Sequence, residues 1–100
     1  EIRKEIYLDI PIAQASGHNN YIVNVYDNRV EIKSGWQGQN VEHVGHKDVA
    51  SVSVKGLVNC TLTLESNTGR VYRIERMARP EANQIKNAIE RQKQKAGLYE

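Results

Sequence analysis

The sequence predicts a mainly β domain in which seven antiparallel strands are followed by one C-terminal amphipathic helix. Up to residue 76, apolar and polar residues alternate with the two-residue period of half-buried strands, and short turns containing Gly or Asn interrupt them. Beyond Met77 the apolar residues recur every three or four positions, which is the period of a helix. We therefore expect residues 1–100 to form one domain, with strands over about 5–76 and a helix over about 79–96.

The first strand is expected in EIYLDIPIA, residues 5–13. Its alternating apolar residues would form one buried face and are Ile6, Leu8, Ile10 and Ile12. Pro11 lacks an N–H group and therefore suits a sheet edge or the end of the strand. The polar SGHNN that follows is expected to be a loop.

The next segment, YIVNVYDNRVEIKSG, predicts a tight hairpin. Asp27 and Asn28 both tolerate the positive φ angles of a two-residue turn. The expected cross-strand pairs are Val25 with Val30 and Val23 with Ile32 on one face, and Asn24 with Glu31 and Ile22 with Lys33 on the other.

After a Gly-rich turn, a weak strand is expected in VEHVGH and a clearer one in VASVSV, with Ala50, Val52 and Val54 on one face. A Lys55-Gly56-Leu57 loop would pair Val54 with Val58 and Val52 with Cys60, so that Cys60 points inward.

The last hairpin is expected around Asn67-Thr68-Gly69, with Gly69 as the left-handed residue. This loop pairs Leu64 with Tyr72 and Leu62 with Ile74. A loop one residue longer would place Leu62 opposite Arg73, which a buried face disfavours.

Pro80 and Glu81 suit the first turn of the helix, because proline needs no N–H partner there and a carboxylate complements the helix dipole. The apolar stripe is narrow and rich in alanine, so the helix should lie close against a sheet; its members are Ala82, Ile85, Ala88, Ile89 and Ala96, and it ends at Gly97.

This order of elements resembles that of a pleckstrin-homology-like (PH-like) domain, and in particular the short bacterial members of that superfamily. The resemblance covers roughly residues 21–95 and rests on the segments VNVYDNRVEIKSG, HKDVASVSV, LTLESNTGRVYRIE and RPEANQIKNAIERQ. It implies a seven-stranded half-open antiparallel barrel, made of two nearly orthogonal sheets, with the helix plugging one end. It also implies binding or scaffolding rather than catalysis.

The chain departs from the phosphoinositide-binding members of that superfamily in two ways. They carry lysine and arginine in the loop between their first two strands, whereas the candidate loops ASGHNN and DN here contain neither. They also carry a tryptophan in the C-terminal helix, whereas Trp36 lies in a loop. Recognition of a phosphoinositide headgroup is therefore not expected.

The composition excludes several other classes. A single cysteine, Cys60, allows no intramolecular disulfide and no Cys/His zinc framework, which suits a reducing compartment. No apolar run approaches the ~20 residues of a membrane-spanning helix, and no signal peptide is recognisable. We expect a cytoplasmic protein. Because the chain starts at Glu1 rather than at methionine, an upstream targeting or membrane segment is compatible with the sequence.

Catalytic, cofactor and metal sites are not expected. His43, His46 and Asp48 form the one cluster that resembles metal ligands or a base with an orienting carboxylate, but we interpret both histidines as solvent-facing residues near a strand end. Cys60 is interpreted as a core residue rather than a nucleophile. No phosphate-binding loop, nucleophile elbow or dinucleotide fingerprint occurs, and no small-molecule substrate is evident.

The favoured function is contact with a protein partner or a second copy of the chain. Trp36, between glycines in SGWQGQ, could anchor a partner, or alternatively fold back over the end of the barrel. We expect Trp36, Ile22 and the sheet edges to form the contact surface, with strand addition as one mode.

The alternative function is electrostatic binding of anionic lipid or nucleic acid. Residues 1–69 carry six Lys or Arg against eight Asp or Glu, whereas residues 70–100 carry eight against four. The candidate anion-binding residues are Arg73, Arg79, Lys86, Arg91, Lys93 and Lys95. They would lie on the last strand and the helix, whose charges can equally be a solvated face.

Overall fold

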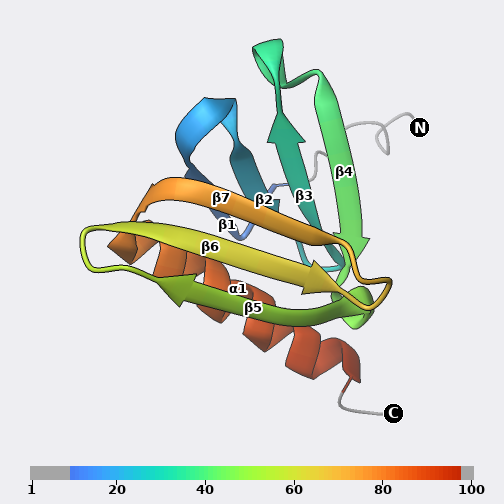
Figure 1. Cartoon of the computed structure of the whole chain (residues 1–100). Coiled ribbons are helices and arrows are strands. Elements are labelled where there is room, and N and C mark those ends of the chain that lie inside the picture. The colour runs from blue at the N-terminus through green and yellow to red at the C-terminus, as the bar shows by residue number, and fades with distance from the viewer. Residues whose placement is uncertain (1–9, 98–100) are drawn as a thin grey trace.

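The computed structural model describes residues 10–97 and confirms a mainly β fold of seven antiparallel strands with one C-terminal helix (Figure 1). The first sheet, sheet A, contains in order β1 (Ala13–Ser16), β2 (Ile22–Val25), β3 (Arg29–Ser34) and β4 (Asn40–Gly45). The second, sheet B, contains β5 (Val49–Lys55), β6 (Asn59–Ser66) and β7 (Val71–Ala78), and is followed by α1 (Arg79–Gly97). Within residues 10–97 no ladder joins the two sheets, so the barrel is not closed.

The first strand begins later than predicted. Residues 10–12 are not in a strand, β1 includes Ser16 from the predicted loop, and residues 5–9 lie outside the described part of the chain. Pairing of β1 with β2 buries Ala13 and Ala15, which leaves Ile10 and Ile12 exposed instead of buried. The helix packs against β1, and only small side chains fit at this contact.

The hairpin of β2 and β3 has the predicted register, including the pairs Val25 with Val30 and Asn24 with Glu31. The turn differs from the prediction, because neither Asp27 nor Asn28 adopts a positive φ. A hydrogen bond of 2.8 Å from the Tyr26 N–H to the Arg29 carbonyl closes the loop.

The register of β5 with β6 was predicted wrongly. Val54 faces Leu62 rather than Val58, and the loop contains Gly56, with φ +123°, followed by Leu57 and Val58. An even shift leaves every side chain on its original face, so alternation alone could not distinguish the two registers. For the same reason Cys60 is buried, as predicted.

Two bulges adjust the strands of sheet B. The ladder is irregular between Val49 and Ser51, which buries Val49 and leaves Ala50 exposed, contrary to its predicted place on the inward face. The β6–β7 hairpin keeps the predicted pairs of Leu62 with Ile74 and Leu64 with Tyr72, and Gly69 has the expected positive φ of +92°. A second irregularity, opposite Thr61, places Arg76 at φ +56°.

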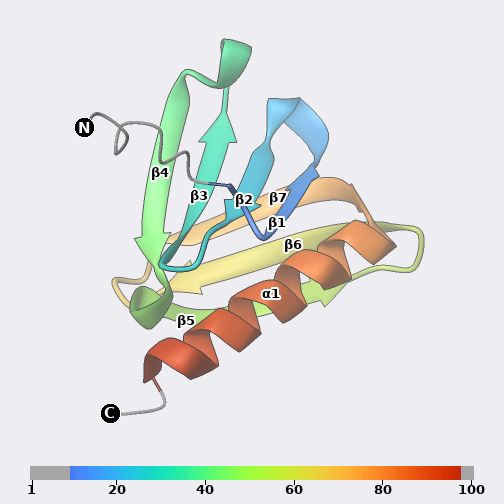
Figure 2. The ribbon, with the colours of Figure 1, turned by 180° about the vertical axis from the view of Figure 1, so that it is seen from behind.

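The core lies where the strands of sheet B cross those of sheet A, and α1 covers its open side (Figure 2). The predicted stripe of the helix is confirmed, since Ala82, Ile85, Ala88 and Ile89 are all buried. Complete burial of an isoleucine side chain contributes about 1.5–3 kcal/mol to the free energy of unfolding. Ile85 and Ile89 therefore contribute most of the stabilisation that packing of the helix against the sheets provides. The side chain of Ala96, the last predicted member of the stripe, lies outside the described part of the structure.

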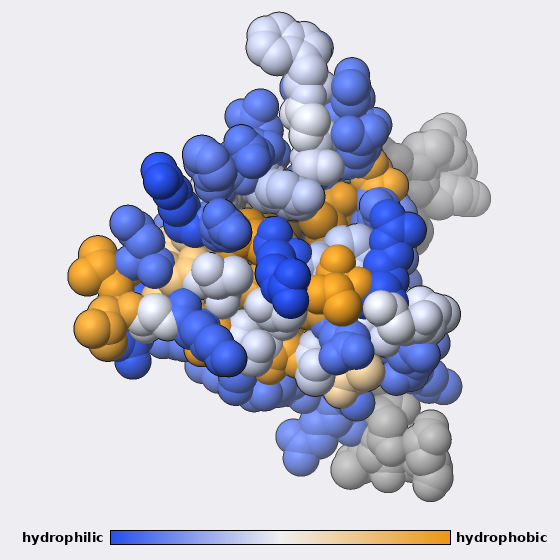
Figure 3. All heavy atoms as spheres, in the orientation of Figure 1, coloured by the Kyte–Doolittle hydropathy of each residue, from blue (hydrophilic) through white to orange (hydrophobic). Residues whose placement is uncertain are grey.

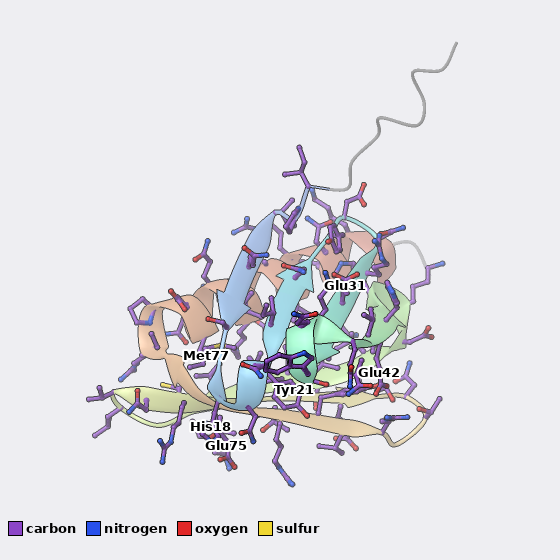
Figure 4. The ribbon with its side chains drawn as sticks, turned by 90° about the horizontal axis from the view of Figure 1, so that it is seen from above. His18, Tyr21, Glu31, Glu42, Glu75 and Met77 are labelled. Carbon is purple, nitrogen blue, oxygen red and sulfur yellow. The ribbon has the colours of Figure 1, made fainter. Side chains whose placement is uncertain are left out.

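The two sheets also meet at the β1–β2 loop, where Gly17 lies directly against β7. A Cβ atom at Gly17 would overlap the side chain of Ile74 and lie 2.7 Å from the carbonyl oxygen of Glu75. Figure 4 shows His18, the next residue of the loop, beside Glu75. The loop that borders sheet A therefore rests on the backbone of sheet B.

Substitution Gly17→Ala should lower the free energy of unfolding by about 1–3 kcal/mol, because the loop must move away from β7. Denaturant unfolding monitored by circular dichroism measures this change. Gly45→Ala is the matched control, since a Cβ there meets only Asp48 Oδ2, at 3.4 Å, and φ is −65°. Equal stability of the Gly17→Ala variant and the wild type would show that the close approach is absent in solution.

Candidate functional site

A groove of about 550 Å³ lies at one end of sheet A, between the β1–β2 and β3–β4 loops. Its lining residues are Ser16, Gly17, Asn20, Tyr21, Ile22, Lys33, Gly35, Trp36, Gln37 and Gly38. Ile22 and Lys33 are direct partners across β2 and β3, which places them side by side on the face of sheet A away from the core. The groove thus brings together Trp36 and Ile22, the two residues predicted separately as partner contacts.

Trp36 is exposed rather than folded over the barrel, with 71% of its surface accessible. The turn that carries it has φ angles of +85° at Gly35, +56° at Gln37 and +68° at Gly38. Glycine adopts such angles without steric cost, so the glycines on both sides of Trp36 allow the tight turn. The turn that these glycines allow therefore exposes the indole of Trp36 to solvent at the edge of the groove.

β4, the free edge strand of sheet A, follows directly after the β3–β4 loop that lines the groove. β4 pairs only with β3 in the described part of the chain, so its outer backbone groups have no ladder partner there. Val41, the partner of Lys33 across the ladder, is exposed on the same outer face as Ile22. An unpaired edge beside exposed apolar side chains can accept an additional strand.

A row of polar side chains crosses the outer face of sheet A next to the groove. Gln14, Asn24, Glu31 and His43 are successive partners on the four strands. Gln14 Nε2 donates to Asn24 Oδ1 at 2.6 Å, and Asn24 Nδ2 donates to Glu31 Oε1 at 2.9 Å. Asn24 and Glu31 are buried, although the alternating pattern had placed them on the face opposite the core. Their mutual bonds satisfy them and hold the strands in register.

Glu42 links β4 to β7 on the opposite face of the sheet. Its Oε1 accepts a hydrogen bond from the Tyr72 hydroxyl at 2.8 Å, and its Oε2 accepts from an Arg70 guanidinium nitrogen at 2.7 Å. Figure 4 shows Glu42 and Tyr21 on the side of the sheet that faces β7, with Glu31 on the other side. The bridge fixes β4 to sheet B.

One of the two histidines predicted to face solvent is buried instead. His43 is exposed, as expected, but His46 is buried, with 2% of its surface accessible. The short 3-10 turn His46–Asp48 directs its ring into the corner between the sheets, where Nε2 donates to the Tyr26 carbonyl at 2.7 Å. His46 Nδ1 is buried and has no hydrogen-bond partner among residues 10–97. His43 and His46 therefore face different surroundings and do not form a joint site.

No three His, Cys, Asp or Glu side chains within residues 10–97 are grouped as a metal site would require. Cys60 is completely buried, and its thiol lies 3.5 Å from the Gly56 carbonyl. A thiol in this position is shielded from substrate.

The candidate anion-binding residues are spread over three parts of the molecule. Arg73 is exposed on β7, and Arg79 begins the helix. Lys86 is paired with Glu90 at 2.9 Å, and Arg91, Lys93 and Lys95 occupy the last turns. At 1.5 Å per residue, Arg79 and Lys95 lie about 24 Å apart along the helix axis. They do not form one continuous patch.

Sequence reasoning missed the contributions of Tyr21, Lys33 and Glu42. The register prediction already paired Lys33 with Ile22, and this pairing was the available signal for its place in the groove. The role of Glu42 depends on how the two sheets cross, which the sequence pattern does not show.

No protein-family model matches the chain, and no curated protein is significantly similar to it. Within residues 10–97, no helix has the length and apolar character needed to cross a membrane.

The bridge from Tyr72 to Glu42 predicts a loss of stability in alkali. Partial burial, followed by the hydrogen bond and the negative charge of Glu42, raises the pKa of Tyr72 above its ordinary value of 10.0, although Arg70 opposes this. Folding then favours the protonated hydroxyl. The stabilisation is complete below the unfolded pKa and is lost as the pH rises through the folded pKa.

Denaturant unfolding of the wild type and of Tyr72→Phe at a series of pH values measures this contribution. Because phenylalanine cannot ionise, the stability difference between the two proteins should be constant up to about pH 10 and shift against the wild type above it. A difference that stays constant throughout the alkaline range would contradict the bridge.

Proposed function

We propose that this chain is a non-catalytic PH-like module of the short bacterial type that binds a protein partner or a second copy of itself. The observation that carries the proposal is the groove in which Trp36, Tyr21 and Ile22 gather beside Lys33. Tryptophan and tyrosine are enriched in the energetically dominant positions of protein interfaces. A volume of about 550 Å³ is sufficient for one or two side chains of a partner.

Strand addition along β4 is the binding mode that the surroundings of the groove favour. A partner strand could pair with the free backbone groups of Asn40–Gly45 and place a side chain beside Trp36. Lys33 would favour an acidic group at that position, because its ammonium lies 3.9 Å from Glu31 and has no closer carboxylate in the described part of the chain.

The order of the elements and the crossing of two antiparallel sheets support the assignment to the PH-like superfamily. The burial of Cys60 and the separation of His43 from His46 support a function in binding rather than catalysis. The dispersal of the cations along α1 makes the helix a poor electrostatic platform, and Lys86 is already paired with Glu90.

Sedimentation velocity at a series of protein concentrations and photo-crosslinking from position 37 in cell extract test this proposal. Trp36→Ala and Ile22→Lys should each weaken association by about tenfold or more, which is the cost of truncating an anchor residue or of burying an unpaired charge. Val71→Ala is the control, because Val71 is exposed on β7 and does not line the groove.

Unchanged self-association and unchanged crosslinks in both groove variants would disprove the contact. If the Val71→Ala control also lost association, the contact surface would have to include sheet B.

A further inference from the structure

The loop between β5 and β6 exposes two adjacent apolar residues at its tip. Leu57 is 80% exposed and Val58 is 77% exposed, and the loop extends past the neighbouring elements at one end of the molecule (Figure 1). Figure 3 shows hydrophobic side chains gathered at this end. The observed β5–β6 register places Val58 in the loop beside Leu57, and neither residue contributes to the core.

Three cations lie on the elements that adjoin this tip. Arg79 lines a hollow of about 480 Å³ together with Leu57 and Val58. Lys55 ends β5 and pairs with Thr61, and the bulge that contains Arg76 lies on the other side of Thr61. Glu75 and Glu81 adjoin the segment 76–80, but none of the three cations forms an ion pair with a described residue.

We propose that this tip, made of Leu57 and Val58 and surrounded by Lys55, Arg76 and Arg79, docks the domain on a bilayer that contains anionic lipid. Two apolar side chains on a projecting loop can enter the boundary between headgroups and acyl chains, while the neighbouring cations contact the negative surface. The proposal is independent of the groove at Trp36.

A bilayer fits the tip better than a protein does. A stable protein interface buries about 800 Å² on each partner, whereas the tip is a projecting loop with only two apolar residues. Insertion into a bilayer needs no complementary surface. The cations lie on both sides of the tip, on β5 and at the junction of β7 with α1, so they could contact one plane together.

Flotation of the 100-residue chain with vesicles tests the proposal, using phosphatidylcholine with and without phosphatidylserine. The wild type should bind the phosphatidylserine vesicles. The double variant Leu57→Ser/Val58→Ser should bind them about tenfold more weakly or worse, because transfer of one apolar side chain out of water contributes at least that factor. Val71→Ser is the control, since it removes an exposed apolar side chain at the other end of β7 and outside the groove at Trp36.

A second measurement places the tip directly in the bilayer. Trp36 is the only tryptophan, so Leu57→Trp in a Trp36→Phe background gives a single fluorescent reporter at the tip. Its emission should shift to the blue on addition of phosphatidylserine vesicles, and the emission of the wild type should not. Circular dichroism confirms that each variant is folded, which is expected because both loop residues are exposed.

Three results would overturn the proposal. Equal flotation of the wild type and the double serine variant would assign vesicle binding to the helix cations alone. Absence of flotation by the wild type at low salt would exclude membrane docking. Loss of self-association in the double serine variant, without vesicle binding by the wild type, would identify the tip as a contact between copies of the chain.

Discussion

The close fit of α1 against the open side of two crossed sheets is the contact on which the rest of the structure depends. Alanines stand at this contact on both elements, with Ala13 and Ala15 on β1 and Ala82 and Ala88 on α1. Their small size lets the helix approach until Ile85 and Ile89 fill the space between the sheets. Because the helix covers the core on this side, the described part of the fold does not require a hydrogen-bonded ladder between β1 and β7. The β1–β2 loop instead contacts β7 through the close packing of Gly17.

This arrangement leaves two exposed features, both in loops that the core holds in place. The glycines around Trp36 present an indole beside the free edge of β4, and the Glu42 bridge to Tyr72 and Arg70 fixes that strand to sheet B. The β5–β6 loop presents Leu57 and Val58 at another end. Under the two proposals above, the domain would hold a protein partner at a membrane, a role that requires binding but no chemistry.

Local patterns predicted the elements well, because alternation and turn residues act between near neighbours. The register of β6 with β7 could be deduced since a loop of another length would bury Arg73. The register of β5 with β6 could not be deduced, because an even shift keeps each residue on its face. It changes only the cross-strand partners and the residues of the loop, which Val58 enters. Likewise, the burial of His46 and the Glu42 bridge depend on how the sheets cross, and the exposure of Trp36 depends on the φ angles of one turn.

The intrinsic fluorescence of Trp36 tests most directly whether the groove is a contact surface, because it is the only tryptophan of the chain. Its emission maximum and its quenching by acrylamide can be measured as protein concentration rises and in the purified complex with any crosslinked partner. In the free chain the indole should be exposed to solvent and readily quenched, and once a partner is bound its emission should shift to the blue and be shielded from acrylamide. An indole that stays fully quenchable in the complex would show that the groove is not the contact surface.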